Sequence, residues 1–290
     1  MAVEIIAEVG ECFNGDMETA HRMIKEAKRT GCDTVKFQIL DMNEVAVDDP
    51  EYDWFYKISF NQEQIEQLIC WADEESIQIL FTPVSVKTAK MMIKAGCKRV
   101  KIASSFIDKR DLLEYIKEHF EEIIISTGMA SLDQVNNIVS FFKSNKKVSI
   151  LHCISEYPTG PLLEQRGLCA LDEGDVHLQM MNMLKMLYPK HCVGYSDHTD
   201  GILAPITAVA MGAEIIEKHI TLDRKTPIEH FNMGLEYMGT DHVLSIEIDE
   251  LEKMVELIRR VERIKGDWNW ERSEGEQVLI DFLTNRYKGR

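Results

Sequence analysis

The sequence alternates between short runs rich in valine and isoleucine and amphipathic stretches of about 10–15 residues, and this alternation restricts the fold more than any other feature. Eight runs are predicted strands, at residues 4–9, 34–38, 77–82, 99–102, 122–126, 148–153, 192–196 and 214–220. Eight stretches are predicted helices, at residues 17–30, 62–75, 86–95, 110–119, 132–144, 178–187, 202–211 and 249–263. Parallel strands need crossover helices, and eight such units close a sheet, so we expect one α/β domain, a (β/α)8 or TIM barrel.

The charge of the chain excludes several classes of protein. The 290 residues include 33 Lys+Arg and 49 Asp+Glu, a net charge of −16, which argues against nucleic-acid and anionic-membrane binding. The seven cysteines are odd in number and form no C-x-x-C pair, so we expect them to be reduced. The first residues do not resemble a secretion signal, and no apolar run approaches the roughly 18 residues that span a bilayer. We therefore expect a cytoplasmic protein.

Polar side chains stand at or just after the end of every predicted strand. In a barrel of this kind the reacting groups come from the C-terminal strand ends and the loops that follow them. A single such residue is as easily a loop anchor, but eight agreeing strand ends favour a site. The residues are Glu8, Lys36, Gln38, Thr82, Lys101, Ser104, Ser105, Ser126, Thr127, His152, Ser155, Ser196, Asp197, His198, Glu217 and His219.

Strand alternation predicts which of these side chains share the barrel interior. Residues two apart point the same way, so Lys36 pairs with Gln38, and Glu217 with His219. Lys36 and Lys101, with hydroxyls from the neighbouring strand ends, predict a local cationic well for a phosphorylated or carboxylated ligand. The alternative is that either lysine neutralises Glu8 or Glu217 inside the barrel.

Two histidines, His198 and His219, end consecutive predicted strands. Neutral imidazoles suit manganese, iron or zinc better than magnesium, and two of them leave open positions at which a metal could polarise a carbonyl. Structural histidines with satisfied hydrogen bonds are an equally good interpretation of this pair alone. The sequence has no P-loop, dinucleotide-binding glycine motif, H-E-x-x-H or G-x-S-x-G, so those chemistries lack support.

Taken in order, the motifs resemble the sialic acid synthase family, the phosphoenolpyruvate-dependent N-acetylneuraminate, legionaminate and pseudaminate synthases. The resemblance spans residues 5 to about 262, and its most distinctive part runs from VGYSDHT to EKHITLDR. Further matching segments are IIAEVG, DTVKFQ, LFTPVS, KIASS, STGMAS and ILHCISEYPT. The resemblance implies a transferase that condenses phosphoenolpyruvate with an N-acyl mannosamine-type or related sugar aldehyde, giving a 2-keto-3-deoxy sugar acid and phosphate in surface carbohydrate biosynthesis.

The resemblance also implies roles for individual residues. His198 and His219 would hold a divalent metal, manganese first and magnesium or cobalt as alternatives, and Glu8 would be the acid/base at C2 of phosphoenolpyruvate. The residues implied in binding phosphoenolpyruvate are Lys36, Thr82, Ser104, Ser155 and Ser196, beside the Lys101 that the strand ends predict. Those implied in binding the sugar are Gln38, Tyr157 and Asp241.

The chain departs from the family pattern at several places. Cys12-Phe13 stands where the family usually has Asn-His, and insertions lie at residues 162–174 and 228–240. The second insertion makes Glu229-His230 compete with Asp241-His242 for one motif, and we favour Asp241. The given sequence runs to Arg290, so we expect a barrel domain at residues 1–265 and a tail at 266–290, and we expect the family's C-terminal antifreeze-like domain to be absent.

This expected absence leaves open how the sugar site is closed. A barrel-to-barrel homo-oligomer and a separate antifreeze-like protein are the partners that the resemblance allows. Two other functions stay open at the level of the sequence: a metal-dependent phosphosugar aldolase or isomerase, and a non-catalytic relative that binds a sugar acid.

Overall fold

Eight parallel strands form one sheet in the computed structural model, which describes residues 2–49, 51–143, 147–156, 171, 173–226, 240–267 and 270–287. The strands are β1 (Glu4–Glu8), β2 (Thr34–Ile39), β3 (Gln78–Pro83), β4 (Arg99–Ile102), β5 (Glu122–Ser126), β6 (Lys147–Cys153), β7 (Cys192–Asp197) and β8 (Ile215–His219). Each predicted strand is present, with ends that differ by at most one residue.

The sheet closes into a barrel through its first and last strands. Its order is β3-β2-β1-β8-β7-β6-β5-β4, and β1 pairs in parallel with β8 over five residues, from Glu4 opposite Ile215 to Glu8 opposite His219. The outer strands of this order, β3 and β4, lie against each other and nearly complete the ring. The predicted (β/α)8 barrel is therefore confirmed.

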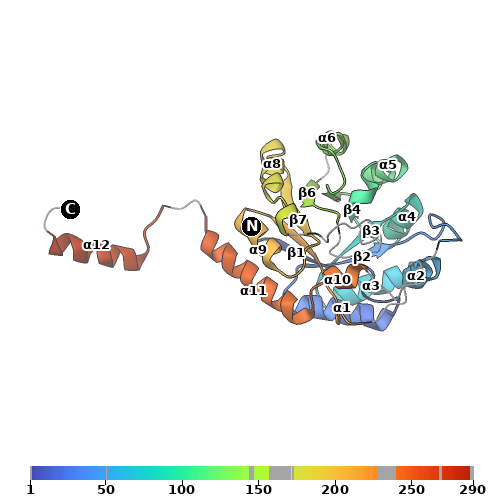
Figure 1. The fold of residues 1–290 in the computed structure, drawn as a ribbon, viewed down its shortest axis with the longest axis horizontal. Coiled ribbons are helices and arrows are strands. Elements are labelled where there is room, and N and C mark those ends of the chain that lie inside the picture. The colour runs from blue at the N-terminus through green and yellow to red at the C-terminus, as the bar shows by residue number, and fades with distance from the viewer. Residues whose placement is uncertain are drawn as a thin grey trace.

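Helices alternate with the strands and surround the sheet (Figure 1). All eight predicted helices are present as α1 (Met17–Arg29), α3 (Gln62–Glu74), α4 (Val86–Lys94), α5 (Arg110–His119), α6 (Leu132–Phe141), α8 (Gln179–Leu187), α9 (Leu203–Ala210) and α11 (Ile248–Lys265). Local sequence explains several starts: Asn61, Ser85 and Ser131 each form a capping box with the residue three positions on.

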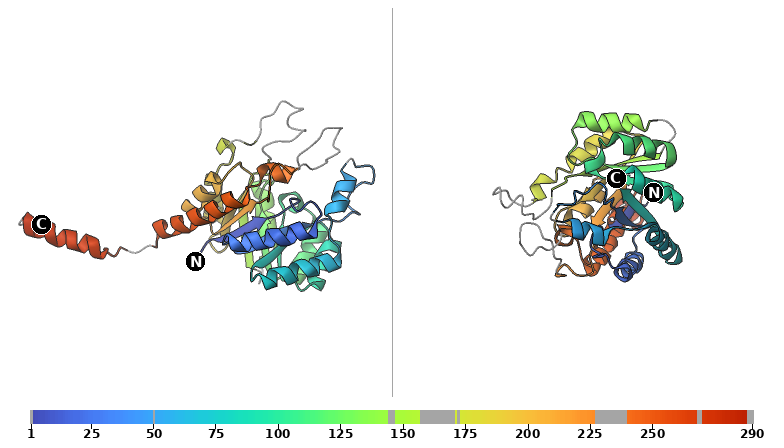
Figure 2. Two further views of the ribbon diagram at one scale, coloured as in Figure 1. Left: turned by 90° about the horizontal axis from the view of Figure 1, so that it is seen from below. Right: turned by 90° about the vertical axis from the view of Figure 1, so that its right-hand side faces the viewer.

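Among the described residues, five further elements were not predicted: α2 (Tyr52–Ile58), α10 (Thr240–Leu244), α12 (Glu274–Arg286) and two short 3₁₀ turns, η1 (Ser104–Phe106) and η2 (Glu173–Asp175). Helix α12 follows α11 after a short connection and extends away from the barrel in both figures (Figures 1 and 2). No residue of α12 is buried. Within the described part of the chain, every helix is too short or too polar to cross a membrane.

The core consists of two apolar regions separated by the sheet. A small cluster fills the barrel interior and contains Ile6, Leu80, Ile124, Leu151 and Ile215, all at most 4% exposed. The larger region lies between the strands and the helices. Four of these five residues stand two positions before a predicted polar strand-end residue, namely Glu8, Thr82, Ser126 and Glu217, so the inner cluster forms an apolar floor beneath polar side chains.

Candidate active site

The strand-end side chains converge on a cavity of about 220 Å³ at the C-terminal mouth of the barrel. Ten of the twelve residues predicted for the site line this cavity: Glu8, Lys36, Gln38, Thr82, Lys101, Ser104, Ser155, Ser196, His198 and His219. Asp241 is buried just behind His219, and Tyr157 lies outside the described residues. Ser105, Ser126 and Glu217 also line the cavity. So do Met129 and Phe106, which the pattern of polar strand ends does not predict because their side chains are apolar.

Two lysines and two glutamates form a buried ionic network in this cavity. Lys36 Nζ lies 2.6 Å from Glu8 Oε2 and 3.8 Å from Glu217 Oε2, and Lys101 Nζ lies 2.9 Å from Glu217 Oε1. All four side chains are at most 5% exposed. Both lysines thus pair with carboxylates, as the alternative interpretation expected, and the four formal charges sum to zero. Each ammonium group has three N–H donors, so an anionic ligand can share the lysines with these carboxylates, but it is then repelled by their negative charge.

The environments of the two glutamates move their pKa values in opposite directions. Burial raises the pKa of Glu8; the nearby Lys36 offsets this only in part, and the charge of Glu217 raises it further. Burial also acts on Glu217, but the charges of Lys101 and Lys36 outweigh it and hold the pKa of Glu217 at about 2. In such a pair, the carboxyl with the raised pKa can exchange a proton, and the carboxyl with the lowered pKa stays ionised. Glu8 is the candidate acid/base of the site.

His198 and His219 face each other across the ends of β7 and β8, with ring centroids 5.5 Å apart. His198 Nδ1 donates a hydrogen bond of 2.9 Å to the carbonyl of Ile154, which leaves the lone pair on Nε2. His219 Nδ1 is buried and has no hydrogen-bond partner within the described residues. Burial lowers the pKa of both histidines, so both imidazoles are neutral and suited to binding a metal.

The described residues contain no cluster of three or more histidine, cysteine or acidic side chains that could hold a metal. A cation at the two histidines would therefore take its remaining ligands from water or substrate. An unpartnered, buried imidazole nitrogen beside a second neutral imidazole fits such a cation.

Asp241, at the start of α10, closes the site behind His219. Its Oδ2 lies 3.8 Å from His219 Nδ1 and accepts a hydrogen bond of 3.1 Å from the backbone N–H of Glu11. Gly10 permits this approach because it has a φ of +52° and because a Cβ at this position would overlap the Asp241 carboxylate. Burial and the charge of Glu11 raise the pKa of Asp241. Glu229 and His230, the competing pair, lie outside the described residues.

The residues that replace the family's usual Asn-His point into the core. Cys12 Sγ lies 3.4 Å from Ser245 Oγ, and Phe13 stacks on Phe60 with centroids 4.7 Å apart. Within the described part of the chain, neither residue lines the cavity. The neighbouring Glu11 accepts a hydrogen bond of 2.5 Å from Trp54 Nε1 and so ties α2 to the loop after β1. This replacement therefore changes packing beside the site rather than the cavity wall itself.

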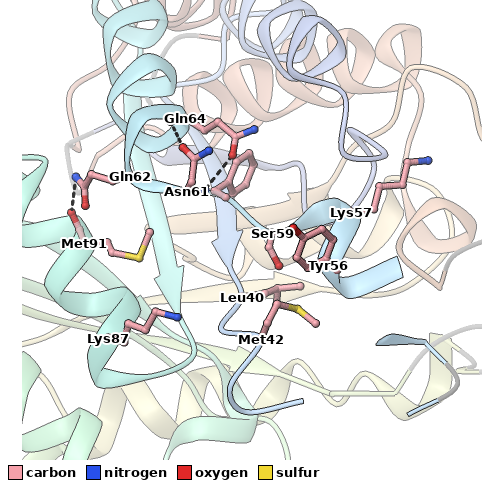
Figure 3. A pocket seen from close by; sticks show the side chains of 11 residues that line it. Leu40, Met42, Tyr56, Lys57, Ser59, Asn61, Gln62, Gln64, Lys87 and Met91 are labelled. Atoms are coloured by element: carbon pink, nitrogen blue, oxygen red, sulfur yellow. Dashed lines mark hydrogen bonds between the residues drawn. The ribbon is translucent and has the colours of Figure 1, made fainter. Parts of the chain in front are cut away.

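A second cavity, of about 530 Å³, opens beside the mouth (Figure 3). It is lined by Leu40, Met42, Tyr56, Lys57, Ser59, Phe60, Asn61, Gln62, Gln64, Lys87 and Met91, and Leu40 also lines the first cavity. Several of its polar groups are already engaged, since Asn61 and Gln64 cap α3 and Gln62 donates to the carbonyl of Met91. It is the larger of the two cavities, but the convergent ionisable groups lie in the smaller one, which we take as the candidate active site.

A barrel with paired acids, lysines and neutral histidines at its C-terminal mouth defines the class of this protein: a (β/α)8-barrel enzyme. Residues 23–269 match the model of the NeuB family, and the chain belongs to that family.

Relatives of the chain are named as synthases. It is 32% identical to N,N'-diacetyllegionaminic acid synthase of Campylobacter jejuni, over 96% of this chain and 82% of the relative. It is 29% identical to human N-acetylneuraminate-9-phosphate synthase, over 90% of this chain and 71% of that protein. The crystal structure of N-acetylneuraminic acid synthetase from Leptospira borgpetersenii, in complex with citrate, is similar with a TM-score of 0.85 and 32% identity, covering 100% of this chain and 94% of that one. The resemblance inferred from the motifs is thus confirmed.

Proposed function

We propose that this protein condenses phosphoenolpyruvate with an N-acyl mannosamine-type or related sugar aldehyde and releases a 2-keto-3-deoxy sugar acid and phosphate. The observation that carries the proposal is the pairing of a buried Lys–Glu network with two neutral histidines in one cavity. The network provides cations for an anionic donor, and the histidines provide a place to activate an aldehyde. The family relationship supports the same type of reaction.

The donor would bind at the two lysines. Phosphoenolpyruvate carries a phosphate and a carboxylate, which match Lys36 and Lys101 with the hydroxyls that surround them. Ser126 Oγ supports this placement, since it is buried in the cavity wall without a hydrogen-bond partner in the described structure and a ligand oxygen would satisfy it. The remaining donor-binding hydroxyls would be Thr82, Ser104, Ser155 and Ser196.

Glu8 would couple donor binding to proton transfer. Its pKa is already raised, and an arriving anion raises it further, so Glu8 takes up a proton and releases the Lys36 ammonium to the ligand. Glu217, with a pKa of about 2, keeps its charge and holds Lys101 in place. Because Glu8 is protonated when the anion binds, the network does not contain a buried carboxylate that has lost its lysine partner.

The acceptor would lie between the histidines and Gln38. His198 and His219 would hold a divalent metal, with manganese as our first choice and magnesium or cobalt as alternatives, and the bound metal would polarise the aldehyde oxygen. Gln38 Nε2 donates to Glu8 at 3.1 Å, so it lies beside the acid/base as a sugar contact. Asp241 and Tyr157 are the further sugar contacts in this proposal.

The bond changes are balanced by one water molecule. C3 of phosphoenolpyruvate bonds to the aldehyde carbon with the electron pair of its C2–C3 double bond, and the aldehyde oxygen becomes a hydroxyl. The water that adds to the electron-deficient C2 supplies two protons: one goes to the aldehyde oxygen, and Glu8 moves the other to the leaving phosphate. Cleavage of the C2–O bond to phosphate then leaves the keto acid. The fixed lysines stabilise the charge that develops on the donor.

The test is to supply phosphoenolpyruvate and Mn²⁺ with a panel of N-acyl mannosamine, bacillosamine-derived and plain aldose acceptors, and to measure phosphate. We expect acceptor-dependent phosphate release that His219→Ala abolishes and that His21→Ala, a histidine stacked on Trp71 away from the cavity, leaves unchanged. Phosphate release equal to that of His219→Ala with every acceptor would refute the proposal. Turnover of a phosphosugar without phosphoenolpyruvate would instead support the aldolase or isomerase alternative.

A further inference from the structure

A second buried ion pair lies directly behind the two histidines, outside the barrel interior. Lys218 Nζ lies 2.6 Å from Asp197 Oδ2, and both side chains are 0% exposed. The two residues are register partners on β7 and β8. Each adjoins a histidine in the sequence, since Asp197 precedes His198 and Lys218 precedes His219. Strand alternation explains why these side chains point away from the cavity that their neighbours line.

The pair is linked to the backbone that carries His198. The Asp197 carboxylate accepts a hydrogen bond of 3.1 Å from the backbone N–H of Thr199, which belongs to the peptide bond that follows His198. It also accepts bonds from the hydroxyls of Thr199, at 2.9 Å, and Tyr195, at 2.6 Å. The Lys218 ammonium donates a hydrogen bond to the carbonyl of Thr199. Both partners of the ion pair thus hold the same short stretch of backbone.

The energetics of such a pair argue for a role beyond stability. Removing two charges completely from water costs several kcal/mol for each ion, and apolar side chains of similar volume usually stabilise a core at least as well. What an ionic pair adds is a fixed geometry, because the ammonium and the carboxylate satisfy each other only in one arrangement. Here that arrangement joins the ends of β7 and β8, from which the two imidazoles project.

We propose that the Asp197–Lys218 pair is a positioning device that sets the spacing and orientation of His198 and His219 for a divalent cation. The proposal rests on the proposed function, because that function assigns a cation to the two histidines. Asp197 and Lys218 act through the backbone and do not contact the cation. Similar supporting contacts behind metal ligands typically change metal affinity about 10–100-fold when they are removed.

The experiment measures Mn²⁺ binding to the purified protein from the electron paramagnetic resonance signal of free Mn²⁺. The main variant is Asp197→Asn/Lys218→Met, in which asparagine still accepts hydrogen bonds from Tyr195 and Thr199 while the ionic link is removed. The single variant Asp197→Asn provides a milder perturbation if the double variant folds poorly. Thermal unfolding of each variant shows whether it is folded at the temperature of the titration.

A matched control is available at the opposite end of the barrel. Arg99 Nη2 lies 2.6 Å from Glu4 Oε2, with side chains 14% and 23% exposed. The variant Glu4→Gln/Arg99→Met removes this pair, and we expect it to lower the melting temperature. The Mn²⁺ dissociation constant should stay within about twofold of wild type, because this substitution leaves the contacts around His198 and His219 unchanged. We expect the Asp197→Asn/Lys218→Met variant to weaken Mn²⁺ binding about 10–100-fold.

The outcomes separate this proposal from the proposed function. One outcome is that the wild-type protein binds Mn²⁺, that His219→Ala does not, and that the Asp197 and Lys218 variants bind it as well as wild type. This outcome would overturn the positioning role alone. Wild-type protein that binds Mn²⁺ no better than His219→Ala would overturn both proposals. Equal weakening in the Glu4/Arg99 control would assign the effect to general destabilisation and would also overturn the positioning role.

Discussion

Replacing Lys101 with methionine removes the ammonium nearest to Glu217 and tests the ionic network directly. Burial raises the pKa of Glu217, but Lys101 and Lys36 hold it at about 2, against an ordinary value of 4.5. This lowering of the Glu217 pKa corresponds to about 3 kcal/mol of stabilisation of the folded protein at neutral pH. In the structure Lys36 Nζ also lies 3.8 Å from Glu217 Oε2, and methionine avoids the cost of burying the Lys101 charge. Both effects reduce the loss, so we expect a net decrease of about 2 kcal/mol in the free energy of unfolding.

The pH dependence has a definite sign. The pKa of Glu217 is lower in the folded protein than in the unfolded chain, so its contribution is fully present above pH 4.5 and is lost as the pH falls toward 2. The variant has a smaller contribution to lose. Urea unfolding measured from pH 7 downward should therefore show the largest difference between wild type and Lys101→Met at neutral pH and a shrinking difference below pH 4.5.

Two further variants complete the test. Lys98→Met removes an exposed pair, in which Lys98 Nζ lies 3.3 Å from Glu121 and the side chains are 75% and 69% exposed, and it should cost less than about 0.5 kcal/mol. Lys101→Met/Glu217→Gln removes both charges and should recover much of the loss. The reasoning is refuted if Lys101→Met costs no more than Lys98→Met, or if the difference from wild type grows on acidification.

Three other predictions concern the cavities and the C-terminal helix. Gly128→Ala would place a Cβ on Ser155 Oγ, so we expect the KM for phosphoenolpyruvate in the phosphate-release assay to rise about 10–100-fold, and an unchanged KM would contradict the assignment of this wall to the donor. Met91→Trp partly fills the second cavity, so kcat and KM should stay within about twofold, whereas a tenfold loss would show that this cavity takes part in the reaction. Ending the chain after Asp267 removes α12, which buries no residue, and the melting temperature should change by less than about 2 °C; a fall of several degrees in calorimetry would show that α12 packs on the barrel.

The barrel can be predicted from local sequence because each of its eight strand–helix units carries the same pattern of residues. The strand Thr34–Ile39 has polar Lys36 and Gln38 two residues apart, and the helix Gln62–Glu74 begins at the capping residue Asn61. Helix α2 was missed because it is only seven residues long and its first residue follows Glu51, which makes no side-chain cap. Short helices of this kind depend on tertiary contacts, here the packing of Trp54 and its hydrogen bond to Glu11.

The order of residues along the chain is enough to predict the (β/α)8 fold and most of the side chains that line the candidate cavity, because alternation along each strand decides which residues point inward. How those side chains interact depends on contacts between strands that are far apart in the sequence. Lys101 and Glu217 are 116 residues apart in the sequence, and no local pattern specifies that they pair while Lys36 lies against Glu8. The opposite pKa shifts of the two glutamates follow from that pairing and from burial, and both are properties of neighbours that only the closed barrel brings together.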